Sequence, residues 1–196
     1  MRTSMLALAL AAITSTAQAQ DSVPMDESRA NSGTTGFVLS GAYEGGGDTL
    51  VSGPGSSSKL HAGTGINLGV GAYHRFAGSP ISLRGTVGLK FAGAEINNVK
   101  YALVRVPLEF IGSYHFANDL RVGAGLVMHL GTRLKNDASF PEVRFDDAGG
   151  GQIEFGYKLI LLTLTGMDYK DQFGNKYKAG SVGLRLVFEF GAPWLS

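Results

Sequence analysis

Long stretches of this chain alternate between apolar residues and small or polar residues, and this pattern constrains the fold more than any other feature. From Leu60 to Tyr73, the even positions are mainly apolar and the odd positions are mainly glycine or polar. A side-chain period of two over that length is typical of a β-strand with two chemically different faces. Similar segments recur along the chain, which predicts an all-β fold.

About eight strand-like segments are separated by connections rich in glycine, asparagine, aspartate or proline. They span 36–44, 59–76, 81–95, 99–116, 120–134, 149–158, 161–170 and 177–190. The connections at 77–80, at 117–119 and near 159 are short, whereas those at 45–58, 135–148 and 171–176 are longer. The connection at 96–98 is an exception, because it is short at the end where the others are longer. Short turns at one end and longer loops at the other are typical of outer-membrane barrels. The pattern predicts a closed antiparallel up-and-down transmembrane β-barrel.

The N-terminus has the features of a secretion signal. Arg2 supplies a positive charge, residues 5–13 are apolar, and Ala17-Gln18-Ala19 forms a small-x-small cleavage site. We therefore expect a signal peptide at 1–19, a flexible periplasmic lead-in at 20–35, a barrel at 36–190 and a short tail at 191–196. The chain has no cysteine, which excludes disulfides, thiolate metal sites and a lipid-modified cysteine at the cleavage site.

The composition favours a membrane protein without a membrane helix. Lys and Arg number 17 and Asp and Glu number 16, so no basic excess indicates a nucleic-acid partner. Charged residues make up 17%, which is below the roughly 25% of soluble domains. No apolar run after the signal approaches the roughly 18 residues of a membrane helix. A closed barrel is the other backbone arrangement that can span a bilayer.

Alternation alone does not say which face is outside, because a soluble lipocalin-like barrel alternates with its apolar face inward. Here the other face is small: Gly63, Gly65, Gly69 and Gly71 share one side of a predicted strand. A solvated exterior of that kind would carry little charge for solubility, whereas the lining of a narrow barrel needs small residues. We therefore expect the apolar face to contact lipid.

The same inner face carries charges of both signs, which can pair within a filled lumen; the alternative is a rim or a soluble exterior. The predicted lumen charges are Arg84, Lys90, Arg105, Glu109, Arg121, Arg133, Glu154, Lys158, Arg185 and Glu189. The interior of an eight-stranded barrel is just wide enough for side chains to fill. We therefore expect no pore for free diffusion.

The chain contains SVGLRLVF from Ser181 and VPLEF from Val106. These two segments resemble small outer-membrane β-barrel proteins of the OmpX and OmpA-membrane-domain type. The first, SVGLRLVF from Ser181, resembles their C-terminal insertion signal, which implies that the barrel-assembly machinery reads this strand. The residues of that assembly signal are Ser181, Gly183, Leu186, Phe188 and Phe190. The second is VPLEF from Val106, which ends in Tyr114-His115-Phe116 and resembles their fourth strand. Pro107 cannot donate to the sheet, so a local bulge is expected there.

No catalytic, cofactor-binding or metal-binding residues are predicted. Lipid A deacylases of similar size use a His-x-Ser pair, and the chain contains no such pair. We expect His61, His115 and His129 to be structural residues on the lumen face and His74 to lie on the lipid side near the periplasmic end. The carboxylates Asp137, Asp146 and Asp147 are expected to be solvated; a calcium site through their oxygens is the alternative.

The loop at 135–148 carries Phe140 and Phe145 among charges. These rings are candidate surface-loop contacts, or they pack over the barrel mouth as a plug.

The sequence thus predicts a monomeric outer-membrane barrel of a Gram-negative bacterium with a structural or surface-interaction role in adhesion or envelope integrity. Its expected partners are outer-membrane lipids, the barrel-assembly machinery and a host or surface ligand bound through the loops. The alternatives are a lipid-modifying enzyme and a narrow solute channel.

Overall fold

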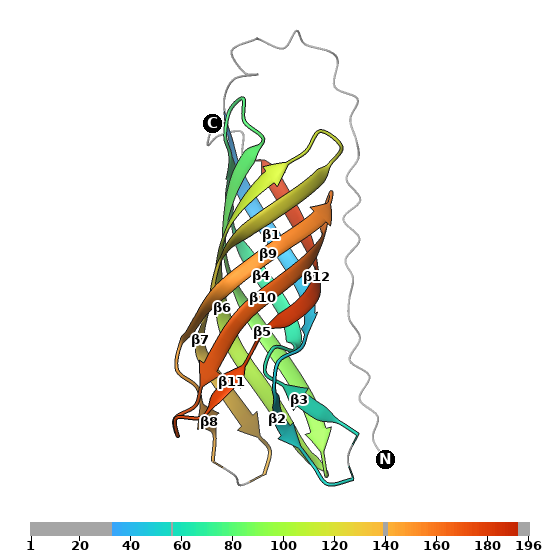
Figure 1. Ribbon diagram of the computed structural model, residues 1–196, viewed down its shortest axis with the longest axis vertical. Helices are drawn as coiled ribbons and strands as arrows, with labels where there is room; N and C mark the ends of the chain where they lie inside the picture. The colour runs from blue at the N-terminus through green and yellow to red at the C-terminus, as the bar shows by residue number, and fades with distance from the viewer. Residues whose placement is uncertain (1–32, 56, 139–140, 192–196) are drawn as a thin grey trace.

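Eight long strands follow one another around a closed ring in the computed structural model, which describes residues 33–55, 57–138 and 141–191 (Figure 1). They are β1 (Thr34–Gly45), β4 (Gly65–Arg75), β5 (Ile81–Ile96), β6 (Val99–His115), β7 (Leu120–Asn136), β9 (Ala148–Tyr157), β10 (Ile160–Lys170) and β12 (Ser181–Gly191). Each strand pairs antiparallel with the next in this order. β12 returns to β1, from Gly36 opposite Gly191 to Gly45 opposite Val182, and closes the ring. The predicted antiparallel up-and-down barrel is confirmed.

The two ends of the barrel differ. At the turn end, short connections at 76–80, 116–119 and 158–159 join neighbouring strands, and β1 begins and β12 ends there. At the loop end lie the short strands β2 (Thr49–Ser52), β3 (Lys59–His61), β8 (Val143–Arg144) and β11 (Lys176–Lys178). Figure 1 shows these four strands gathered at the bottom of the view. The barrel is therefore plain at one end and elaborated at the other.

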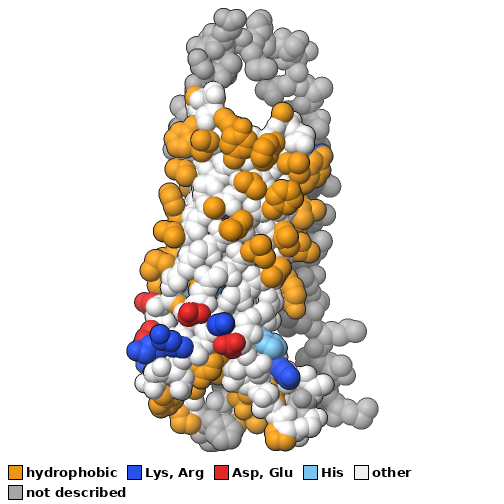
Figure 2. All heavy atoms as spheres, viewed as in Figure 1, with side chains coloured by type: hydrophobic (Ala, Val, Ile, Leu, Met, Phe, Trp, Pro, Cys, Tyr) orange, Lys and Arg blue, Asp and Glu red, His pale blue; other side chains and the backbone are white. Residues whose placement is uncertain are grey.

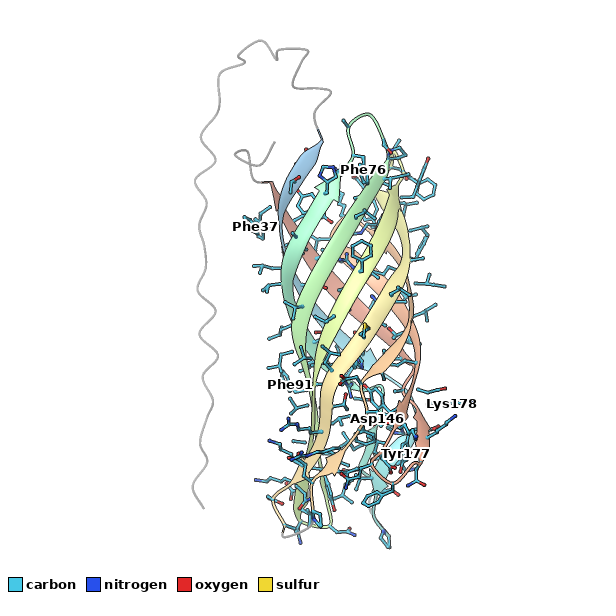
Figure 3. All side chains as sticks on the ribbon, turned by 90° about the vertical axis from the view of Figure 1, so that its left-hand side faces the viewer. Phe37, Phe76, Phe91, Asp146, Tyr177 and Lys178 are labelled. Carbon is cyan, nitrogen blue, oxygen red and sulfur yellow. The ribbon has the colours of Figure 1, made fainter. Side chains whose placement is uncertain are left out.

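Large apolar side chains from all eight barrel strands are exposed on the outer surface. This apolar band contains Phe37, Leu39, Leu68, Val70, Val87, Leu89, Phe91, Leu108, Phe110, Val122, Leu126, Ile153, Phe155, Leu162, Leu164, Leu184, Leu186 and Phe188. Figure 2 shows hydrophobic side chains over the upper part of the visible face and charged side chains near the loop end. Phe37 and Phe91 point away from the barrel (Figure 3). No helix of the described residues is long and apolar enough to cross a membrane.

Two of the predicted strands are each divided in the structure. Residues 59–76 form β3 and β4, and residues 177–190 form β11 and β12. The interruption before β4 is a turn, after which the side-chain alternation restarts. Leu60 and Ala62 are therefore buried rather than lipid-facing. The predicted loop at 45–58 also contains β2, which forms a hairpin with β3.

A bulge in β7 reverses the two faces of that strand near the loop end. Val104 of β6 pairs with Arg133, but Val106 pairs with Leu130, so β7 has one extra residue here. Gly131 adopts φ 57°, a conformation that glycine tolerates and that commonly begins such a bulge. The expected irregularity near Pro107 is thus found close by, and its extra residue belongs to the neighbouring strand.

Candidate functional site

Arg185 lies at the centre of a buried ion cluster inside the barrel, where it contacts three carboxylates. Its Nη2 donates to Glu109 Oε1 at 2.7 Å, and its Nη1 donates to Glu109 Oε2. Glu154 Oε1 lies 3.3 Å from Nη1, and Glu44 Oε1 lies 3.4 Å from Nη2. Arg185 is only 1% exposed. The bidentate contact with Glu109 uses the planar fork of the guanidinium, the geometry that suits a carboxylate best.

Two further cations complete the cluster. Lys90 Nζ donates to Glu44 Oε2 at 2.5 Å, and Arg84 Nη2 donates to both oxygens of Glu154 at 2.7 and 2.8 Å. We call Glu44, Arg84, Lys90, Glu109, Glu154 and Arg185 the lumen ion network. Its three cations and three anions cancel in formal charge, which is what burial of such a cluster requires.

Neutral side chains fill the remaining hydrogen-bonding positions of these carboxylates. Asn67 Nδ2 donates to Glu109 at 3.1 Å, Ser181 Oγ donates to Glu44 at 2.9 Å, and Gln152 Nε2 donates to Glu154 at 2.9 Å. Small residues make room for them: a Cβ on Gly183 would lie 2.5 Å from Glu44 Cγ. The lumen at this level is filled by side chains.

Five of the ten predicted lumen charges belong to the lumen ion network, and Arg105, Arg121 and Glu189 also lie on the inner face. The structure corrects the other two. Arg133 is exposed, because the extra residue at Gly131 turns it outward. Lys158 lies in the turn between β9 and β10 with φ 55° and is exposed as well. Sequence reasoning missed Glu44, although it follows Val38 and Ala42 at even spacing on the inner face of β1. Glu44 is the last residue of the predicted strand 36–44, and this position made its even spacing on the inner face easy to overlook.

Arg105 is fully buried and lies between the lumen ion network and the loop end. Its Nη1 donates to the carbonyl of Ala62 at 2.8 Å, and its Nη2 donates to that of Thr64 at 2.6 Å. Its guanidinium also lies 5.9 Å from the ring centre of Tyr169. Arg105 therefore ties the turn between β3 and β4 to the barrel wall.

On the loop-end side of Arg105, apolar side chains from opposite walls pack across the opening of the barrel. This mouth cluster contains Leu60, Ala62, Ala92, Leu103, Val127, Leu134, Phe145, Ala148, Met167, Tyr169 and Ala179. Phe145 is 7% exposed, and its ring centre lies 5.6 Å from that of Tyr169 and 6.0 Å from that of Tyr177. This packing supports the plug alternative for Phe145 over a surface contact. Phe140 lies outside the described residues.

Each of the four histidines has a hydrogen-bond partner. His129 Nδ1 lies 2.5 Å from the Tyr169 hydroxyl. His115 Nε2 lies 2.8 Å from Ser82 Oγ, and His74 Nδ1 lies 2.8 Å from Thr35 Oγ1. His61 Nδ1 lies 3.2 Å from the carbonyl oxygen of Gly47. The described residues contain no group of three or more metal-ligating side chains.

The residues of the predicted assembly signal lie in β12, which closes the ring against β1. Leu186, Phe188 and Phe190 face outward and are 42–51% exposed, whereas Ser181 is buried against Glu44. Recognition of β12 by the assembly machinery stays a prediction.

Asp171 organises the loop that follows β10. Its Oδ1 accepts from the backbone N–H groups of Phe173 and Asn175 at 2.9 and 2.8 Å, and its Oδ2 accepts from Asn175 Nδ2 at 2.9 Å. Burial alone would raise the pKa of the Asp171 carboxyl, but these hydrogen bonds outweigh it and hold the pKa below its ordinary value of 3.8. The loop presents Phe173, which is 72% exposed, as the aromatic ring that sequence reasoning missed.

We expect the order of this loop to persist to low pH. Because the pKa of Asp171 is lower in the folded state, its carboxylate stabilises the loop at neutral pH, and this contribution is lost only as pH falls through the folded pKa. The amide chemical shifts of Phe173 and Asn175 should titrate together, with a midpoint below 3.8. A midpoint at or above that value would contradict the role given to Asp171, and Asp171→Asn should abolish the titration.

No protein-family model matches the chain, and no curated protein matches it in sequence. Among solved structures, the chain is similar to Ail, the attachment invasion locus protein of Yersinia pestis, whose crystal structure was determined in complex with the heparin analogue sucrose octasulfate. The two chains share 10% sequence identity, and the TM-score is 0.45. The match covers 80% of this chain and 99% of Ail. The closed ring of eight antiparallel strands follows from the strand pairing itself.

Proposed function

We propose that the chain is an integral outer-membrane β-barrel of a Gram-negative bacterium, with a closed lumen and a role in surface interaction. The observation that carries the membrane assignment is the apolar band. Leu126 is 67% exposed, Leu184 is 62% exposed, and comparable side chains occur on every strand of the ring. Water-soluble proteins rarely expose apolar patches of more than a few hundred Å², whereas a bilayer favours a surface of this kind.

The interior supports the same orientation. Charged residues of the lumen ion network are almost completely buried, and their partners lie on other strands across the lumen. Together with the mouth cluster on its loop-end side, the lumen ion network fills the barrel interior between the two ends. This packing argues against the narrow-channel alternative. No observation favours the lipid-modifying alternative, and the proposal assigns no reaction to the chain.

The membrane assignment is tested by folding the protein into phospholipid vesicles. We expect it to float with the vesicles in a density gradient and to shift in gel mobility when the sample is boiled. Both results follow if the apolar band contacts hydrocarbon and the strand ring resists detergent until heated. A protein that stays monomeric in detergent-free buffer and does not float would overturn the proposal.

The surface-interaction role is supported by a basic row at the loop end. Arg133 of β7 lies directly opposite Arg144 of β8, and Lys170 of β10 lies directly opposite Lys176 of β11. The backbone N–H of Gln172 donates to the carbonyl of Arg144 and joins the two pairs. Like charges placed directly opposite are destabilising. Glu142 offsets this cost at Arg144, where its Oε1 accepts from Nε at 3.0 Å, and an anionic partner would offset it at the exposed Arg133, Lys170 and Lys176. We therefore propose an anionic polymer on a neighbouring surface as the ligand class.

This role predicts salt-sensitive binding to immobilised heparin, used as the polyanion probe. The double change Arg144→Glu and Lys176→Glu should move elution to markedly lower salt, because exposed charge contacts are screened by ions. The matched control is Lys100→Glu at the tip of the β5–β6 hairpin, which should elute like the parent protein. Unchanged elution of the double variant would remove the basic row from the proposal.

A further inference from the structure

The turn end of the barrel contains a cavity with a volume of about 410 Å³, within the range of small-ligand sites. Three cationic residues line it from three separate elements: Arg75 at the end of β4, Arg121 at the start of β7, and Lys158 in the turn after β9. The acidic residues that line it are Asp119 and Glu189. Its lining therefore carries a formal charge of +1, without counting the neutral form of His115.

Arg121 has more donor groups than its partners use. Its Nη1 donates to Glu189 Oε1 at 2.7 Å, while Arg75 Nη2 shares the same carboxylate through Oε2 at 3.4 Å. The Arg121 side chain is 6% exposed, yet its Nε and Nη2 have no acceptor among the described residues. A buried guanidinium N–H without an acceptor is costly, so an acceptor entering this cavity would be bound favourably.

The same cavity has an apolar side that reaches the outer surface. Leu159, Phe116, Phe188 and Phe190 line it, and each is 42–51% exposed. Charged groups on one side and outward-facing apolar groups on the other fit an amphiphile better than a free ion. Aromatic side chains at a strand end are also typical of the membrane–water boundary.

We propose that this cavity binds the phosphate of an anionic phospholipid in the leaflet at the turn end. Arg121 and Arg75 hold the phosphate oxygens through charge-assisted hydrogen bonds, and Lys158 adds a nearby positive charge at the rim. The acyl chains leave past Phe116, Phe188 and Phe190 toward the apolar band. This inference rests on the proposed membrane location.

The test uses the full chain folded in zwitterionic detergent micelles and titrated with dioctanoyl-phosphatidylglycerol. Backbone amide shifts of residues 116–121 and 187–190 report binding, and dioctanoyl-phosphatidylcholine, whose headgroup is zwitterionic with no net charge, is the control. We expect the anionic lipid to bind at least about tenfold more tightly than the control lipid. Arg121→Gln and Arg75→Gln should each weaken its binding by about tenfold, whereas Arg144→Gln at the loop end should not.

Arg75 is 48% exposed on its side chain, so Arg75→Gln keeps the test decisive if Arg121→Gln fails to fold. Equal binding of the two lipids, or unchanged binding by both variants, would overturn the inference. Inorganic phosphate that competes as strongly as the lipid would show that the site takes a free ion and would overturn the lipid assignment. A protein that floats with vesicles but fails these titrations contradicts the cavity site alone, whereas one that does not float contradicts the membrane location.

Discussion

Replacing Arg185 by methionine is expected to lower the free energy of unfolding by about 3 to 5 kcal/mol, the range for a buried ion pair that loses one partner. Arg185 contacts Glu109, Glu154 and Glu44, and all four residues are buried. Without it, the lumen ion network retains three carboxylates against two cations. Urea unfolding of vesicle-folded protein, with the midpoint and slope both recorded, measures the change.

The matched control for this experiment is Arg133→Met, because Arg133 is an exposed arginine on the same barrel. Its effect should stay within about 0.5 kcal/mol, as for most surface changes. Adding Glu109→Gln to Arg185→Met should recover part of the loss, because the excess negative charge is then removed. Equal stability of the Arg185 and Arg133 variants would show that the network does not stabilise the barrel.

Replacing Leu126 by arginine is expected to lower the free energy of unfolding from a bilayer by about 2 to 4 kcal/mol. Leu126 lies near the middle of β7 and is among the most exposed members of the apolar band. A charged side chain at that depth must displace hydrocarbon contacts and draw water or headgroups inward. The variant should fold in detergent but lose stability in vesicles.

Phe173→Arg is the corresponding control, since Phe173 is 72% exposed in the loop after β10, outside the apolar band. Its stability should differ from that of the parent by about 0.5 kcal/mol or less. If both arginine variants behaved alike in vesicles, Leu126 would not contact hydrocarbon, and the apolar band would need another explanation.

The eight barrel strands and their two faces could be predicted because a period of two survives wherever a strand is regular. Arg84, Lys90, Glu109 and Arg185 all lie inside for that reason. The prediction of which side chains face the lumen failed where a strand departs from the regular alternation. The extra residue at Gly131 shifts the alternation of β7, and a period-based argument continues past it unchanged.

The structure of the loop end was harder to predict from the sequence, because it depends on contacts between segments that are far apart in the chain. Phe145 and Leu60 are separated widely in sequence, yet both pack in the mouth cluster. The β2–β3 hairpin has no strong alternation of its own, and the turn that follows β3 is held by Arg105 through the carbonyl groups of Ala62 and Thr64. Backbone carbonyls of this kind carry no residue-specific signal. The turn-end cavity likewise is lined by the ends of β4, β6, β7 and β12 and by the turns after β6 and β9.

The mouth cluster also has a consequence for the order of assembly. Its members come from β3, β5, β6, β7, β9 and β10 and from the connecting residues Ala62, Phe145 and Ala179, so they stand on opposite walls of the ring. Members on facing walls can meet only when the sheet has curled far enough to bring those walls together across the lumen. In an incompletely closed sheet, Phe145 and Tyr169 would be exposed to proteases and chaperones, whereas the closed barrel buries them. Burial of the mouth cluster is therefore a feature that distinguishes the closed barrel from an open sheet.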